Sequence, residues 1–156
     1  ISRAARTYGV KHYFVATPFE DQRELVREIT DHWQNGHGAK ANPARKEALT
    51  IIKAVDSFEA IICQLRSTCN RRPLVVATSA RKQGNQISYE ALRNHLSINE
   101  SPVLLLFGTA HGLAPEIMDK ADVVLPPIAG NADYNHLSVR SAVSIILDRL
   151  LGDRDN

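Results

Sequence analysis

One stretch of the sequence decides how the rest of the chain is interpreted, namely Val103-Leu104-Leu105-Leu106-Phe107-Gly108-Thr109-Ala110-His111-Gly112-Leu113. Five apolar residues run without a break and stop at Gly108, which is typical of a strand buried on both faces of a parallel sheet. Gly108 and Gly112 bracket a short loop, and helical spacing resumes at Leu113. Open α/β sheets bind ligands at such strand ends, where glycine lets the backbone come close. A plain strand–turn–helix connection is the alternative.

Strand and helix patterns alternate on both sides of this stretch. We expect strands near residues 12, 51, 74, 103 and 123, and helices over 1–8, 17–33, 44–49, 57–69, 88–96, 113–118 and 137–151. This alternation predicts an α/β fold in one domain, residues 1–156, with a mostly parallel sheet and helices on both faces.

Several local signals fix the ends of these elements. Thr17 and Glu20, with Pro18 between them, form a capping box for the second helix. Residues 35–43 are polar and contain two glycines, which favours a loop. Ser138 is in position to cap the last helix, whose apolar stripe is broad enough to predict a second covering surface.

Composition narrows the class of protein. The net charge is only +2, so no global basic field indicates nucleic acid, although Lys40, Arg45 and Lys46 cluster in one polar stretch. Cys63 and Cys69 match neither a disulfide framework nor a metal site, which indicates a reduced, cytoplasmic protein without a metal. No apolar run has transmembrane length, so we expect no membrane association. The first residues read as the inside of a helix, so we expect a short strand and loop to precede Ile1.

Three loops follow three apolar strands, at 78–86, 108–112 and 126–138. Loops at the same edge of a parallel sheet converge. They contain neither a dinucleotide-binding fingerprint nor a phosphate-binding P-loop. A ligand here would be held by backbone groups and apolar walls, which suits an adenosine without a phosphate.

The chain resembles the SPOUT class of RNA methyltransferases in four motifs that occur in the class's order. The motifs are Ala4 to Val10, Phe107 to Leu113, Leu125-Pro126-Pro127-Ile128, and Asn135-His136-Leu137-Ser138-Val139. The similarity is to a bacterial branch of undefined substrate. It implies a deep C-terminal trefoil knot that binds S-adenosylmethionine, S-adenosylhomocysteine as product, an RNA substrate (tRNA or rRNA), and a homodimer whose active site forms between subunits.

The resemblance also implies a set of cofactor-binding residues, which come from the ends of three strands and from the loop before the last helix. These are Thr78, Ser79, Phe107, Gly108, Thr109, Gly112, Leu125, Pro126, Ile128, Asn135, His136, Leu137 and Val139. Backbone groups of Leu125, Ile128 and Leu137 are expected to face the adenine, while their side chains resemble ordinary core.

The catalytic candidates are Arg6, His111, Ser138 and Arg140. Arg6 matches the arginine associated in the class with activating a ribose 2′-hydroxyl. A guanidinium stays charged, so it would stabilise developing alkoxide charge rather than accept the proton. Arg140 opposes the helix dipole in its first turn, which indicates a role toward RNA phosphate or the cofactor carboxylate. His111 is either catalytic or simply exposed.

Two departures leave the acceptor open. The class often has a glutamate where this chain has Ala110-His111, and its last motif often reads Ser-Leu-Asn-Val-Ser. Ribose 2′-O methylation depends on Arg6, whereas guanine N1 methylation would need a carboxylate such as Asp133. The alternative from another functional class is a non-catalytic RNA- or nucleotide-binding module with the same knotted fold.

Overall fold

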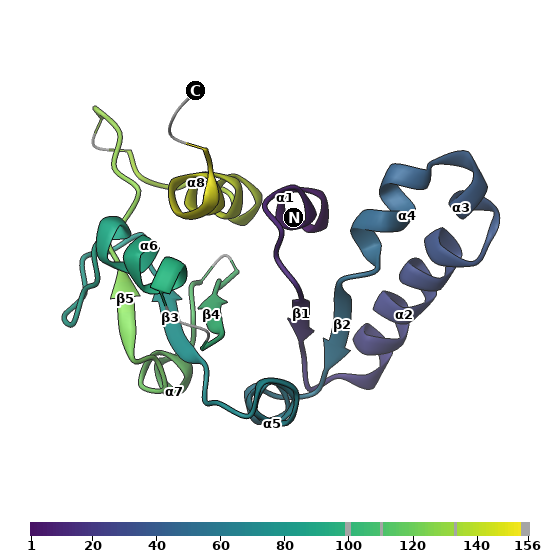
Figure 1. The fold of residues 1–156 in the computed structure, drawn as a ribbon, viewed down its shortest axis with the longest axis horizontal. Helices are drawn as coiled ribbons and strands as arrows, with labels where there is room; N and C mark the ends of the chain where they lie inside the picture. Colours follow the sequence, from purple (N-terminus) through teal and green to yellow (C-terminus); the bar gives the residue numbers. More distant parts are fainter. Residues whose placement is uncertain (99–100, 110, 133, 154–156) are drawn as a thin grey trace. The chain divides into compact units, whose positions relative to one another are not determined.

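A computed structural model describes residues 1–98, 101–109, 111–132 and 134–153 of the chain, which is traced in Figure 1. The chain divides into two compact units, residues 1–64 and 65–156. The division falls inside α5 (Phe58–Cys69).

The first unit is built around two parallel strands, β1 (Tyr13–Ala16) and β2 (Ile52–Val55), with Tyr13 opposite Ile52. Three helices connect these strands: α2 (Glu20–Gln34), α3 (His37–Ala41) and α4 (Pro43–Leu49). The short helix α1 (Ser2–Thr7) precedes β1 and packs against α4. Gly9 follows α1 with a φ of 71°, as a helix-ending glycine should.

The predicted capping box at the start of α2 is wrong. The helix begins at Glu20, its N-cap is Phe19, and no side chain caps it. The Thr17 hydroxyl donates its hydrogen to Oε1 of Gln22 (2.7 Å) and accepts one from the Phe19 N–H (3.4 Å). The Thr17 oxygen therefore accepts from Phe19 rather than from Glu20, and Thr17 lies two residues before the N-cap position.

The loop predicted for residues 35–43 is also wrong, since it contains α3. Gly38 is buried beneath Trp33, and a Cβ at this glycine would lie 2.6 Å from Cε3 of the indole. Glycine lowers helix propensity, which is why the sequence favours a loop here. Packing against Trp33 outweighs that local preference.

The second unit holds a three-stranded parallel sheet in the order β4 (Val103–Leu106), β3 (Leu74–Thr78), β5 (Val123–Leu125). Helices α6 (Tyr89–Ile98) and α8 (Val139–Leu151) pack on one face. Their shared core consists of Val76, Leu92, Leu125, Ile146 and Leu150. The short helix α7 (Pro115–Met118) connects β4 to β5.

All five strands were predicted near these positions, and every strand pairing is parallel, as expected. One point differs. Hydrogen bonding among the described strands gives two sheets, whereas the sequence pattern predicts one. Apolar periodicity locates strands but carries no information on which strands pair.

The last helix agrees with the sequence in its cap. The Ser138 hydroxyl accepts a hydrogen bond from the Ser141 N–H (3.2 Å), and α8 begins at the next residue. Val143, Ile146, Leu147 and Leu150 are buried along it, while Leu151 remains 42% exposed. None of the described helices is long and apolar enough to cross a bilayer.

Candidate cofactor and acceptor site

The three loops predicted to converge do begin at one edge of the second unit's sheet. Strands β3, β4 and β5 run parallel, so their carboxyl ends lie together. Thr78, the last residue of β3, donates its hydroxyl hydrogen to the carbonyl oxygen of Leu106, the last residue of β4 (2.8 Å). This hydrogen bond joins two of the strand ends where an open sheet binds its ligands.

The loop after β4 folds back on itself. The Gly112 N–H donates to the Thr109 carbonyl (2.7 Å), and Gly112 has a φ of 84°. A Cβ on Gly108 would lie 2.1 Å from the Gly112 carbonyl carbon. Any other side chain at 108 would therefore push the loop open. The shape of the loop itself requires both glycines.

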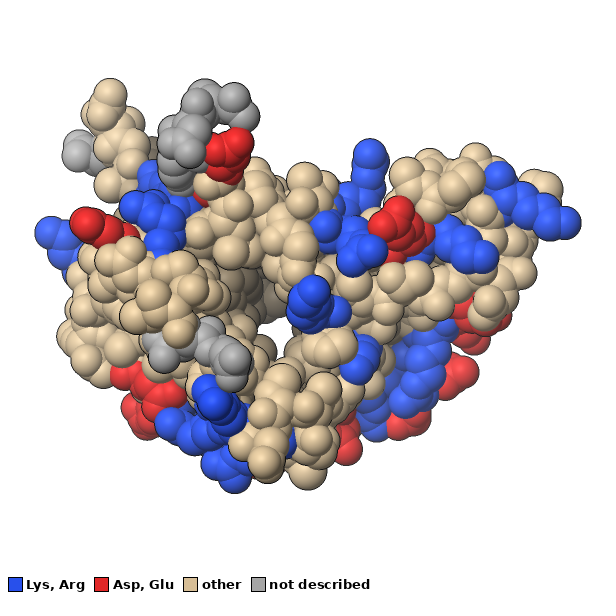
Figure 2. Space-filling model, viewed as in Figure 1, with Lys and Arg blue, Asp and Glu red and all other residues tan. Residues whose placement is uncertain are grey.

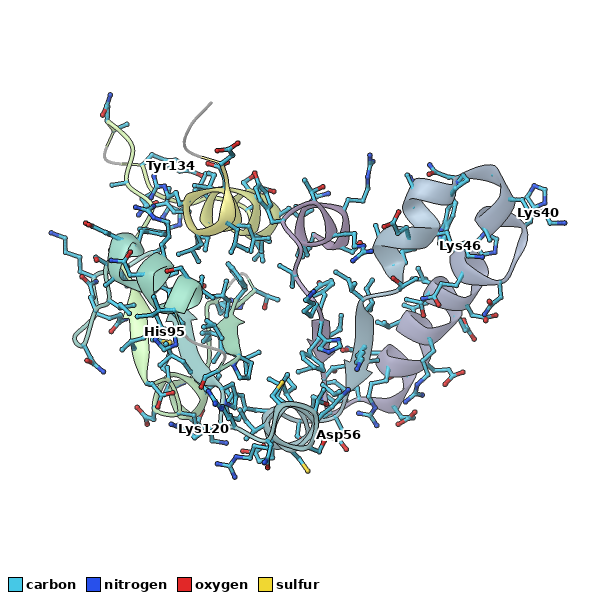
Figure 3. All side chains as sticks on the ribbon, viewed as in Figure 1. Lys40, Lys46, Asp56, His95, Lys120 and Tyr134 are labelled. Atoms are coloured by element: carbon cyan, nitrogen blue, oxygen red, sulfur yellow. The ribbon has the colours of Figure 1, made fainter. Side chains whose placement is uncertain are left out.

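The loop between β5 and α8 is attached to the loop after β3. Nδ2 of Asn135 donates to the Ala80 carbonyl oxygen (3.1 Å). The rings of Tyr134 and His136 meet at 62°, with their centroids 5.4 Å apart. Both side chains are exposed, and Figure 3 shows Tyr134 on this loop beside α8. Leu137 is 46% exposed, which corrects the expectation that it would resemble core.

Residues 126–130 follow β5 and begin the loop that leads to α8. Their backbone makes no hydrogen bond to any described part of the chain, while Leu125 just before them is 1% exposed. Ile128 and Phe107 pack against the core of the unit. An apolar wall with free amide and carbonyl groups suits a purine, whose edge needs both donors and acceptors.

The second unit thus gathers most of the predicted site. Thr78, Ser79, Phe107, Gly108, Thr109, Gly112, Leu125, Pro126 and Ile128 lie at or just beyond the strand ends, and Asn135, His136, Leu137 and Val139 lead into α8. His111 and Arg140 are exposed. The Ser138 hydroxyl is occupied by the helix cap and by Ser141 Oγ, 2.9 Å away.

Arg6 lies in the first unit, near the end of α1. Its guanidinium contacts one carboxylate oxygen of Glu47 twice, through Nη2 (2.9 Å) and Nε (3.2 Å). The two side chains are 45% and 63% exposed, so the ion pair stabilises the fold by only about 0–1 kcal/mol. Two hydrogen bonds to one carboxylate oxygen restrict the orientation of the Arg6 guanidinium.

Glu47, the partner of Arg6, is not among the residues that the sequence singled out. It lies 41 positions from Arg6, so no local pattern connects the two. One signal was available, because Glu47 is the single acidic residue between Asp31 and Asp56 in an otherwise basic segment. Asp133, the carboxylate considered for base methylation, lies outside the described residues, as does Ala110 of the second motif. Among the described residues, no cluster of His, Cys, Asp and Glu could hold a metal ion.

A protein family described as SAM-dependent RNA methyltransferase matches residues 1–152. The chain belongs to this family. The match covers both units and confirms the resemblance drawn from the four motifs.

Relatives of this family include the tRNA (guanine-N(1)-)-methyltransferase of Oleidesulfovibrio alaskensis (strain G20), 46% identical over 153 residues. That alignment covers 98% of this chain and 35% of the relative, so the chain spans about a third of that protein. An uncharacterized protein of Aquifex aeolicus (strain VF5) is 39% identical over 150 residues, which are 96% of this chain and 73% of that protein.

Solved structures agree with the fold. The crystal structure of TrmJ from Z. mobilis ZM4 superimposes with a TM-score of 0.65 at 19% identity, covering 99% of this chain and 62% of that chain. At this identity the likeness concerns the α/β architecture with its parallel strands and says nothing about the substrate.

Proposed function

We propose that this chain methylates RNA, either tRNA or rRNA, with S-adenosylmethionine as the methyl donor and S-adenosylhomocysteine as the product. The family match over residues 1–152 carries this proposal. The strand-end loops of the second unit support it, because they combine free backbone groups at 126–130 with the apolar side chains of Phe107 and Ile128. A non-catalytic binding module is not favoured.

The cofactor would bind at the loops of the sheet edge, which contain neither of the sequence motifs that hold the phosphates of a nucleotide. Backbone groups around Ile128 and Leu137 would hold the adenine, and the Gly108–Gly112 loop would lie along the ribose and the amino-acid part. When bound, S-adenosylmethionine supplies an electrophilic methyl group on a sulfonium sulfur. The residues of the chain have to position that methyl and the acceptor oxygen or nitrogen, and to exclude water.

We propose a ribose 2′-hydroxyl as the acceptor, with Arg6 as the group that stabilises its negative charge. Glu47 would hold the guanidinium in place through Nε and Nη2, leaving Nη1 for the RNA. A guanine N1 acceptor, named for the relative in Oleidesulfovibrio alaskensis, remains the alternative. That name describes a protein about three times as long, so the activity is not assigned to the matched third.

The direct test is incubation of the chain with S-adenosylmethionine and unmodified bacterial RNA, followed by digestion and nucleoside mass spectrometry. A 2′-O-methylated nucleoside supports the proposal in full. Formation of N1-methylguanosine would support the methyltransferase activity but would show that the acceptor is guanine N1 rather than a ribose hydroxyl. S-adenosylhomocysteine binding and RNA binding without any methylated nucleoside would favour the binding module.

Leu137→Asp is expected to weaken S-adenosylhomocysteine binding by on the order of tenfold or more, because burying the leucine against a ligand contributes about 1.5–3 kcal/mol. The fold should persist, since the leucine is 46% exposed. The measurement is isothermal titration calorimetry. Ile98→Asp is the matched control, because Ile98 is 79% exposed on α6, away from the strand-end loops. Equal affinities for both variants would remove Leu137 from the site.

We further propose that residues 1–156 form one SPOUT domain, that its C-terminal part carries the trefoil knot, and that the protein acts in the cytoplasm. A homodimer using α8 is part of the same proposal, since this helix has a broad apolar stripe.

Sedimentation at micromolar concentration is expected to give roughly twice the 17.3 kDa mass of the chain. Leu151→Arg should shift the equilibrium toward the monomer, because Leu151 is 42% exposed at the end of α8. A fully active wild-type monomer would contradict the dimer.

A further inference from the structure

Charges are segregated between the helices of the first unit. Residues 1–16 contain three cations and no acidic side chain, and residues 35–55 contain four cations and only Glu47. Helix α2 is the reverse, with five acidic and two basic residues. Figure 2 shows blue atoms over α1, α3 and α4, and red and blue atoms intermixed over α2.

The cations of α2 are neutralised by their own helix. Arg23 pairs with Glu20, and Arg27 pairs with both Glu20 (2.7 Å) and Glu24 (2.9 Å). The hydrogen bond from Arg27, followed by that from Arg23, holds the pKa of the Glu20 carboxyl below its ordinary value. These arginines are therefore engaged and add little to the positive field outside the unit.

Within the described residues, the cations of α3 and α4 form no ion pair with a carboxylate of their own helices. Lys40 and Lys46 are exposed and form no ion pair within the described residues. Figure 3 shows the two lysines on these neighbouring helices. The one acidic side chain of this segment, Glu47, is engaged by Arg6.

The ring of Trp33 supports the side chain of Arg45. Its guanidinium carbon lies 4.3 Å from the centroid of the Trp33 ring, and the ring is itself packed on Gly38. Stacking uses the face of a guanidinium and leaves its N–H edge for an anion. Among the described residues the Arg45 guanidinium has no carboxylate partner. An arginine held on an aromatic ring without a carboxylate partner, beside two helices that carry exposed lysines, has the chemistry that binds phosphate groups.

From these observations we infer that Lys40, Arg45 and Lys46 form a surface that contacts the phosphate backbone of the RNA substrate. The inference rests on the proposed function and adds where the RNA is held. Phosphate contacts position a nucleic acid without reading its sequence. The chain thereby has a means to hold RNA despite a net charge of only +2.

The test compares two charge-matched double variants of the chain, Lys40→Glu with Lys46→Glu and, as control, Arg66→Glu with Lys120→Glu. Arg66 and Lys120 are exposed cations on α5 and after α7, outside the proposed surface. Binding to unmodified bulk tRNA is measured by fluorescence anisotropy between about 50 and about 300 mM KCl, a range of salt over which phosphate contacts weaken. S-adenosylhomocysteine titration checks that each variant retains its fold.

The surface variant should bind RNA on the order of tenfold more weakly than the control, with a salt slope smaller by about two, one for each lost phosphate contact. Arg45→Lys, which keeps the charge but loses the fork, should show an intermediate loss. If the two double variants bind RNA equally well and the wild-type chain methylates RNA, the proposed RNA-binding surface is wrong while the proposed function stands. A wild-type chain that neither binds nor methylates RNA would overturn the proposed function together with it.

Discussion

Replacing Arg6 by alanine is expected to lower methyl transfer by on the order of a hundredfold or more, while the affinity for S-adenosylhomocysteine stays nearly unchanged. A ribose hydroxyl is a poor nucleophile at neutral pH, so charge that develops on its oxygen must be stabilised. Arg6 presents a guanidinium oriented by Glu47. Because the ion pair is exposed, its loss should change the thermal unfolding temperature little. Single-turnover kinetics with saturating cofactor measure the effect.

Arg3→Ala is the matched control, because Arg3 is an exposed arginine on the same helix with no carboxylate partner among the described residues. Glu47→Gln tests the pairing itself. It leaves Arg6 charged but removes the carboxylate that orients it, so turnover should fall by less than in Arg6→Ala. If Arg6→Ala retains full turnover while Asp133→Ala loses it, the acceptor is a base and the ribose proposal is wrong.

The sequence predicted the parts of the fold that depend on local patterns. The apolar run from Val103 to Leu106 is a strand of a parallel sheet, with Leu104 and Leu106 buried. The Ser138 hydroxyl accepts a hydrogen bond at the start of α8, as its position indicated, and the hydroxyls of Ser57 and Ser88 do the same at the starts of α5 and α6. Signals of this kind lie within a few residues of the feature that they predict.

Features that depend on the packing and pairing of particular side chains, which no local pattern encodes, could not be predicted in this way. Helix α3 forms because Gly38 fits beneath Trp33, although its composition favours a loop. Thr17 fails to cap α2 because the helix begins only at Glu20 with Phe19 at the N-cap position, so the Thr17 hydroxyl lies two residues too early. The same limitation applies to the candidate site, where motifs located the strand-end loops but the Arg6–Glu47 pair spans 41 positions.

Gly108→Val is expected to abolish measurable S-adenosylhomocysteine binding, and the structure changes the reason for that expectation. From the sequence, a valine would fill the adenosine pocket. In the structure, even its Cβ would lie 2.1 Å from the Gly112 carbonyl carbon and 2.4 Å from the Leu113 nitrogen. The clash is with backbone, so the loop has to open and its backbone moves away from the position that it holds at the sheet edge. Calorimetric titration measures binding, and circular dichroism checks that the strands persist.

The control for that variant is Gly84→Val, in the loop after β3, where no atom lies within 4 Å of the added Cβ and φ is not positive. It should bind S-adenosylhomocysteine like the wild type. Gly108→Ala separates the two explanations. A small methyl would leave most of a pocket free, yet it meets the same backbone contact at 2.1 Å. Loss of binding in both Gly108→Ala and Gly108→Val therefore indicates that the folded-back loop holds the cofactor. Normal affinity in Gly108→Val would place the cofactor elsewhere.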